Sequence, residues 1–168
     1  MEQWLQRPVT EVIAGLAGRE FSAEDLMQVT LDRIEETASS LAAFTCLRDA
    51  EALLADARAA DARIAAGNAR ALEGIPLGVK DLEDAKGLVT SYGSVPFKDN
   101  LASRDSIQVE RLRAAGAIVV GKTNAPEFGY TAISKNLLFG ASRNPWNLEV
   151  TPGGSSGGSS AAIAGGVI

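Results

Sequence analysis

The sequence of 168 residues contains no histidine. Without an imidazole, these residues form neither a Ser-His-Asp triad nor a Cys-His dyad, and they cannot build a histidine-ligated zinc site. If the chain carries out acid–base chemistry near neutral pH, the proton acceptor must therefore be a carboxylate or a neutral lysine.

Cysteine is almost absent as well, because Cys46 is the only one. A single cysteine forms no intrachain disulfide and supplies no thiolate cluster for a metal ion. Cys46 lies in the apolar stretch Leu41–Leu47, and this position predicts a buried and unreactive thiol.

Positive charge and long hydrophobic runs are also scarce. The sequence has 16 Lys and Arg against 21 Asp and Glu, and the net charge of −5 argues against a nucleic-acid-binding surface. No run approaches the roughly 20 apolar residues that a membrane-spanning helix needs. Residues 1–8 lack the apolar core of a signal peptide. We therefore expect no contact with nucleic acid or membrane, and a cytoplasmic location.

The first part of the sequence, residues 1–70, is predicted to be mainly helical. Ser22 can cap a helix whose first turn carries acidic residues, and apolar residues from Leu26 to Ile34 then recur at helical spacing. An alanine-rich segment predicts a second helix over residues 50–66, which Gly67 ends.

Residues 74–168 have the pattern of an α/β core. A short apolar run over residues 75–79 ends at Lys80, which we expect to lie at the end of a buried strand. A helix is predicted to begin near residues 105–108, and the apolar strand 117–120 follows it. This order predicts a sheet covered by helices. Residues 123–152 are expected to form loops with short helices.

The segment 151–160 is rich in glycine and serine and leads into a predicted helix of small residues. Such a composition is typical of a flexible linker. A phosphate-binding loop is disfavoured, because two serines follow Gly158 where that motif needs a lysine. A third interpretation is a serine-based catalytic system, in which a desolvated lysine such as Lys80 accepts the proton. Lys80 taken alone is better explained as a lysine that extends from a strand end into water.

Four segments in the same order resemble the amidase signature family: residues 74–81, 121–129, 144–146 and 151–159. The resemblance implies an α/β fold with a mixed, twisted sheet covered by helices. It further implies that residues 1–168 are the N-terminal portion of a single amidase domain.

The family resemblance also implies a Ser–cis-Ser–Lys triad. By position, Lys80 matches the family's lysine and Ser155 matches the bridging serine, with a cis peptide bond between Gly154 and Ser155. Ser156 is expected to be a supporting hydrogen-bonding residue. A neutral Lys80 would take a proton through Ser155 from the nucleophilic serine and return it to the leaving amine.

The family's nucleophile and its oxyanion-binding amides lie in a second glycine-rich segment, which the resemblance places just past Ile168. The implied reaction is hydrolysis of a small-molecule carboxylic amide through a serine acyl-enzyme, without a metal or organic cofactor. Residues 1–168 alone are expected to be inactive.

Three kinds of protein remain open at this point. Residues 126–129 resemble those of general amidases, which favours a hydrolase. An amidotransferase A subunit that makes ammonia for tRNA-bound glutamate is the second, and it would need a partner subunit. A non-enzymatic truncated fragment is the third. The sequence does not determine the oligomeric state, and a homodimer stays open.

Overall fold

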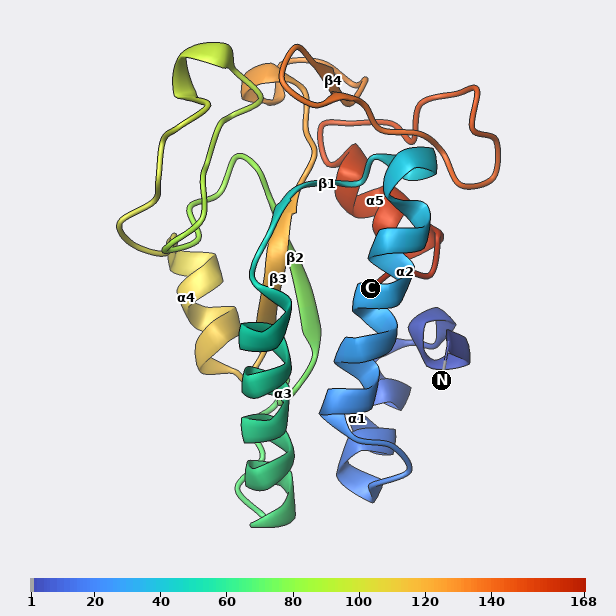
Figure 1. Cartoon of the computed structure of the whole chain (residues 1–168), viewed down its shortest axis with the longest axis vertical. Helices are drawn as coiled ribbons and strands as arrows, with labels where there is room; N and C mark the ends of the chain where they lie inside the picture. The colour runs from blue at the N-terminus through green and yellow to red at the C-terminus, as the bar shows by residue number, and fades with distance from the viewer. Residues whose placement is uncertain (1) are drawn as a thin grey trace.

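The computed structural model describes residues 2–168 and contains helices on both sides of a small sheet (Figure 1). The helices are η1 (Glu2–Gln6), α1 (Val9–Gly18), α2 (Ala23–Leu41), α3 (Ala50–Ala65), η2 (Val95–Phe97), α4 (Ile107–Ala114), η3 (Glu127–Gly129) and α5 (Gly157–Ala164). The strands are β1 (Phe44–Leu47), β2 (Pro76–Lys80), β3 (Ile118–Thr123), β4 (Lys135–Asn136) and β5 (Gly140–Ala141).

Strand β3 lies at the centre of a sheet of order β1-β3-β2. β2 runs parallel to β3, with Lys80 opposite Thr123, whereas β1 is antiparallel to β3. Every residue of β3 is buried, as expected for a strand covered on both faces. The α/β class and the mixed, helix-covered sheet predicted from the sequence are therefore confirmed.

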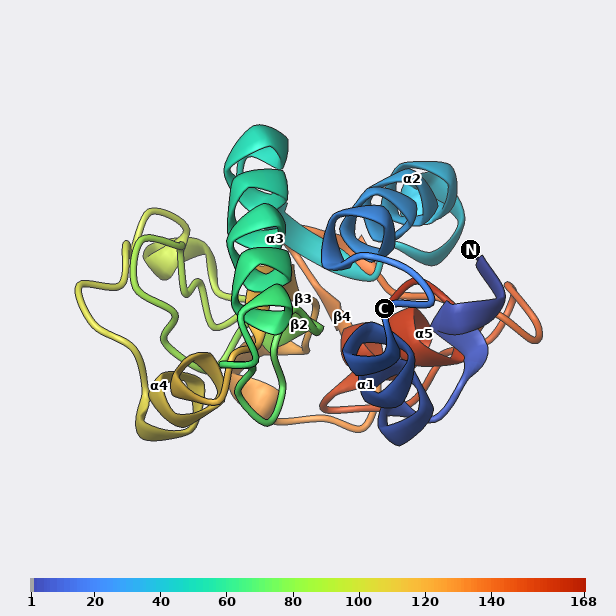
Figure 2. The ribbon, with the colours of Figure 1, turned by 90° about the horizontal axis from the view of Figure 1, so that it is seen from below.

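The side chains of β3 alternate between two hydrophobic cores, one on each face of the sheet. Ile118 and Val120 join the larger core with residues of α1, α2, α3 and α5. Val119 joins the smaller core with Val79 of β2 and Val109 of α4. Both views place α4 on the opposite side of the sheet from α2 and α5 (Figures 1 and 2).

The two long helices begin where the sequence predicts. The Ser22 hydroxyl accepts a hydrogen bond from the amide of Asp25, and the Asp25 carboxylate accepts one from the amide of Ser22, which forms a capping box. The carboxylate of Asp49 caps α3 by accepting from the amide of Ala52. None of the helices within residues 2–168 is long and apolar enough to span a bilayer.

The structure corrects three expectations. Cys46 is half-buried rather than buried, and it lies on β1, a strand that residues 44–47 form within the mainly helical first part. β2 is an edge strand that is mostly half-buried, so Lys80 does not end a fully buried strand. The region 123–152 also contains the antiparallel pair β4–β5, where only loops and short helices were expected.

Candidate active site

Lys80 and Ser155 are far apart in the sequence but in contact in the structure. The Lys80 Nζ donates a hydrogen bond to the Ser155 Oγ over 2.6 Å. Lys80 is the last residue of β2, and the next backbone amide, that of Asp81, donates to the carbonyl of Thr123 on β3. The parallel pairing of the two strands thus places Lys80 at the end of β2, where it meets Ser155.

Partial burial changes the acidity of this lysine. Desolvation lowers the pKa of Lys80 below that of an ordinary lysine, and the negative charge of Glu83 opposes this effect in part. A lowered pKa makes the neutral amine, which can accept a proton, more accessible near neutral pH.

The backbone around Ser155 has an unusual geometry. The Gly154–Ser155 peptide bond is cis. A Cβ added at Gly154 would lie 2.8 Å from the carbonyl carbon of Ala132, so the loop approaches this neighbour more closely than a side chain allows. Ser156 is exposed, and within residues 2–168 its hydroxyl makes no hydrogen bond, although its carbonyl accepts from both the amide and the hydroxyl of Ser160. The role of Ser156 as a supporting hydrogen-bonding residue stays a prediction.

The second half of the glycine–serine segment is packed against the sheet rather than extended as a linker. This half forms α5, and a Cβ added at Gly158 would lie 2.3 Å from the amide nitrogen of Asn124 and 2.5 Å from the carbonyl oxygen of Ala43. The Ser159 hydroxyl lies 2.7 Å from that of Thr123. These contacts fasten the start of α5 to the end of β3.

A buried amide network, which the sequence analysis did not single out, lies beside this junction. The Asn124 side chain accepts from the Asn136 amide over 2.7 Å and donates to the Ser142 hydroxyl over 3.1 Å. It thereby ties the β4–β5 pair to β3. The only sequence signal was its position directly after the apolar strand, within the family-like segment 121–129.

A second cluster that the sequence analysis missed lies under β2 and β3. The fully buried Lys122 Nζ donates to the Asp81 carboxylate over 3.2 Å and to the Thr90 hydroxyl over 2.9 Å. The Asp81 carboxylate also accepts from the amide of Ser91, at 3.0 Å, and from the Ser91 hydroxyl. Desolvation lowers the pKa of Lys122, and the charge of Asp81 opposes this shift. The signal available in the sequence was a charged residue at the end of each of two apolar strands.

Three aromatic side chains form a cluster that includes Phe128, the residue before Gly129. The rings of Tyr92, Phe97 and Phe128 lie 5.5–6.0 Å apart, centre to centre. Tyr92 and Phe128 both adopt left-handed backbone conformations, with φ of 55° and 50°. A Cβ added at Gly129, the next residue, would lie 3.6 Å from the Ser155 Oγ, so this turn borders the candidate site.

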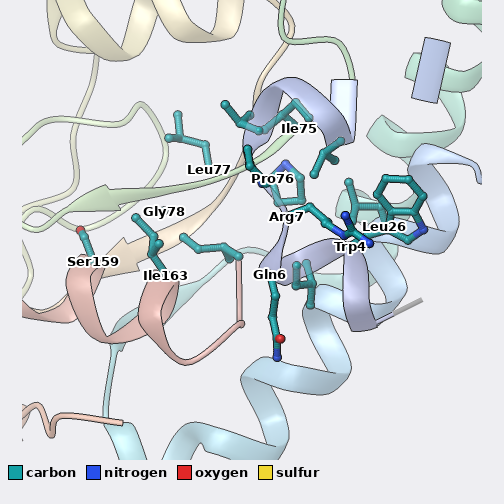
Figure 3. Close-up of a pocket in the computed structure, with 15 residues that line it drawn as sticks. Trp4, Gln6, Arg7, Leu26, Ile75, Pro76, Leu77, Gly78, Ser159 and Ile163 are labelled. Carbon is teal, nitrogen blue, oxygen red and sulfur yellow. The ribbon is translucent and has the colours of Figure 1, made fainter. Parts of the chain in front are cut away.

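An apolar cavity of about 530 Å³ lies beside β2, as Figure 3 shows. Its walls include Trp4, Leu26, Gly78 and Ser159, but neither Lys80 nor Ser155 lines it. We therefore define the candidate site by its side-chain chemistry rather than by this cavity. In the part of the chain that the structure describes, no group of three His, Cys, Asp or Glu residues could hold a metal ion.

Comparison with known proteins identifies the family. The sequence model of the amidase family matches residues 25–168. The chain belongs to the amidase family. This result confirms the resemblance drawn from the sequence motifs.

Several proteins are similar to this chain of the amidase family. The A subunit of glutamyl-tRNA(Gln) amidotransferase from Ralstonia pickettii is 52% identical over 151 residues, which are 90% of this chain and 30% of that protein. The structure of a peptide amidase from Stenotrophomonas maltophilia has a TM-score of 0.88 and 31% identity, and the match covers 99% of this chain and 36% of that one. The A subunit of glutamyl-tRNA(Gln) amidotransferase from Thermotoga maritima has a TM-score of 0.72 and 30% identity, over 87% of this chain and 29% of that one. The amidase chain thus spans about a third of the length of these relatives.

Proposed function

We propose that the protein carrying this chain hydrolyses a carboxylic amide to an acid and an amine or ammonia. The observation that supports this proposal best is the 2.6 Å contact between Lys80 Nζ and Ser155 Oγ in a chain of the amidase family. A lysine of lowered pKa next to a hydroxyl can move a proton without histidine, which these residues lack.

In this proposal the nucleophile is a serine outside residues 1–168. As its oxygen bonds to the amide carbonyl carbon, its proton passes to the Ser155 Oγ, and the proton of Ser155 passes to the neutral Nζ of Lys80. The reverse transfer then protonates the departing nitrogen as the C–N bond breaks, which leaves an acyl-enzyme. Water cleaves the acyl-enzyme by the same proton route, and the cycle needs neither a metal nor an organic cofactor.

The experiment that tests this role replaces Lys80 by alanine in the whole protein. Because Lys80 would accept the proton in every turnover, Lys80→Ala should reduce kcat by at least about 10³-fold while the protein stays folded. The matched control is Lys86→Ala, since Lys86 is an exposed lysine in the loop after β2, and this variant should keep the original rate. A folded Lys80→Ala variant that retains most of its rate would contradict the proposal.

The second candidate is an amidotransferase A subunit. The 52% identity to the Ralstonia pickettii protein favours it, because that relative is named as one subunit of a larger enzyme. In that case the amide cleaved would supply ammonia for tRNA-bound glutamate, and a partner subunit would be required.

One assay separates the two candidates. The whole protein is purified alone and its release of ammonia from glutamine and from a panel of simple amides is measured. Turnover of simple amides by the isolated protein would favour the general amidase. Ammonia release that requires added amidotransferase partner subunits and charged tRNA would favour the second candidate.

A further inference from the structure

The Asp81–Lys122 pair is buried completely and has no part in the proposed proton transfers. The side chains of Lys122 and Asp81 are 0% and 2% exposed. Removing two charges from water is costly, and such a pair persists only where further hydrogen bonds satisfy both partners. Those bonds are present, from the Ser91 amide and hydroxyl to Asp81 and from Lys122 to the hydroxyl of Thr90 and the carbonyl of Val89. The pair is thus held in a single geometry.

The buried pair restricts the position of Lys80 through the covalent backbone. Asp81 follows Lys80 directly, its side chain is held by Lys122, and its amide donates to the carbonyl of Thr123 over 2.9 Å. The backbone at the end of β2 is therefore fixed from two directions. The backbone to which the Lys80 side chain is attached therefore has little freedom to move.

Asp81 is also connected to the surroundings of Ser155 through two successive backbone hydrogen bonds. The carbonyl of Asp81 accepts from the amide of Tyr92 over 3.1 Å, and the carbonyl of Tyr92 accepts from the amide of Phe128 over 2.8 Å. Gly129 follows Phe128 and borders the Ser155 hydroxyl. Because Tyr92 and Phe128 both hold left-handed conformations that non-glycine residues disfavour, this connection depends on its surroundings to persist.

We infer that the buried Asp81–Lys122 pair is a positioning device for amide cleavage, which fixes Lys80 through the chain and Ser155 through Tyr92 and the turn at residues 128–129. This inference rests on the proposed function. The carboxylate of Glu83 is the charge that acts on Lys80 itself, while Cys46 and Asp84 are the other titratable groups around Lys122.

Loss of the pair should loosen the Lys80–Ser155 contact. A misplacement of about 1 Å between reacting groups costs roughly 10²-fold in rate. A loosened Lys80 also gains contact with water, so its pKa should rise towards that of an ordinary lysine. The acid limb of the kcat–pH profile should then move to higher pH.

The test uses the whole protein with two variants of the cluster. Asp81→Asn removes the charge partner of Lys122, and Ser91→Ala removes one hydroxyl and is the milder change should Asp81→Asn fail to fold. We expect kcat to fall about 100-fold in Asp81→Asn and about 10-fold in Ser91→Ala, with KM changing less than about threefold. Both variants should move the acid limb of the profile to higher pH.

A matched control is Leu53→Ala, which empties a fully buried site on α3 in the other core. It should lower thermal stability without moving the pH profile. If Ser91→Ala and Asp81→Asn lose stability but keep the original profile, as Leu53→Ala does, the pair is merely structural and the inference is wrong. If Lys80→Ala itself leaves kcat unchanged, the proposed function is wrong. If Lys80→Ala lowers kcat but Asp81→Asn and Ser91→Ala do not change kcat or the pH profile, only the inference about the buried pair is wrong.

Discussion

Lys80 and Lys122 belong to neighbouring strands, yet their side chains end in different surroundings. Lys122 is fully buried and meets a carboxylate, that of Asp81. Lys80 is half-buried and, within residues 2–168, its Nζ is hydrogen-bonded to a neutral hydroxyl, that of Ser155. Burial lowers the pKa of both, but only Lys122 has a carboxylate within hydrogen-bonding distance to stabilise its charge. Lys80 is therefore the lysine better suited to losing its proton.

The pH dependence of turnover follows from the direction of the Lys80 shift. The active form is the neutral amine, so kcat should rise with pH as Lys80 loses its proton. Because desolvation lowers the pKa of Lys80, this rise should be complete at a lower pH than an ordinary lysine would allow. The measurement is kcat from pH 6 to about pH 10 in the whole protein. A rate that falls steadily above neutrality while the protein remains folded would contradict the assignment.

At the scale of the elements, α5 packs so closely against the end of β3 that there is no room for a side chain at Gly158. Both neighbours of this position are backbone groups, of Asn124 and Ala43, which cannot rotate away. The loop that carries Ser155 leads directly into this helix. The packing of α5 against β3 therefore also determines the position of the Ser155 hydroxyl.

Gly158→Ala should consequently destabilise the protein by about 3 kcal/mol, the upper range for overpacking a rigid site. The free energy of unfolding from urea titration measures the change. The control is Gly18→Ala at the end of α1, where the nearest atoms to a new Cβ lie 3.9 Å away, so stability should change little or rise slightly. Equal stability of both variants would show that α5 can shift without cost.

A buried carboxylate fastens the end of α3 to the segment before β2. Burial opposes ionisation of Glu73, but hydrogen bonds from Arg70 and Arg63 outweigh it and lower its pKa to about 2, from 4.5 in an unfolded chain. The group is thus ionised in the folded protein over a wider pH range than in the unfolded one. Its stabilising contribution is complete above about pH 5 and is lost as pH falls towards 2.

Glu73→Gln should therefore reduce the free energy of unfolding by about 3 kcal/mol at pH 7 and by much less near pH 3. Urea midpoints measured across this range test the expectation. Glu11→Gln is the control, because Glu11 on α1 forms an exposed pair with Arg7, which precedes the helix, and this pair should contribute little at any pH. A loss in Glu73→Gln that is independent of pH would mean that packing, rather than the charge, is responsible.

The elements predicted from the sequence are those whose signals are local. The cap at Ser22, the alanine-rich α3 and the apolar runs of β2 and β3 need no distant partner to be recognised. β1 was not predicted because it becomes a strand only by pairing with β3, 74 to 79 residues later in the chain. The β4–β5 pair has only two residues in each strand, too few for a periodic pattern.

The candidate site likewise contains residues that the sequence indicated and residues that it did not. The family motifs led to Lys80 and Ser155, whose contact the structure contains, although their catalytic roles stay predictions. The partnership of Asp81 with Lys122 could not be found from the sequence, because the two side chains meet only once β2 and β3 are aligned. A charged residue in an apolar strand signals that a partner exists without indicating which residue it is.

For the molecule as a whole, the proposal assigns two members of the triad to residues 1–168 and places the nucleophile outside them. Expressed alone, they should have no measurable amidase activity, because loss of the nucleophile removes the covalent route. The assay combines simple amides with a serine-directed phosphonate. Stoichiometric labelling of a serine in residues 1–168, with turnover that Lys80→Ala abolishes, would place the nucleophile within this chain and contradict the assignment.

The central position of β3 also has a consequence for how the chain folds. Within residues 2–168, β1 and β2 are not paired with each other, and each is hydrogen-bonded to β3. During synthesis from the N-terminus, the helices can form as they emerge, whereas the sheet must wait until about residue 123 has left the ribosome. Until then β1 and β2 carry unpaired backbone edges. Before residue 123 emerges, the nascent chain therefore exposes the strand edges that a chaperone specific for unpaired strands would bind.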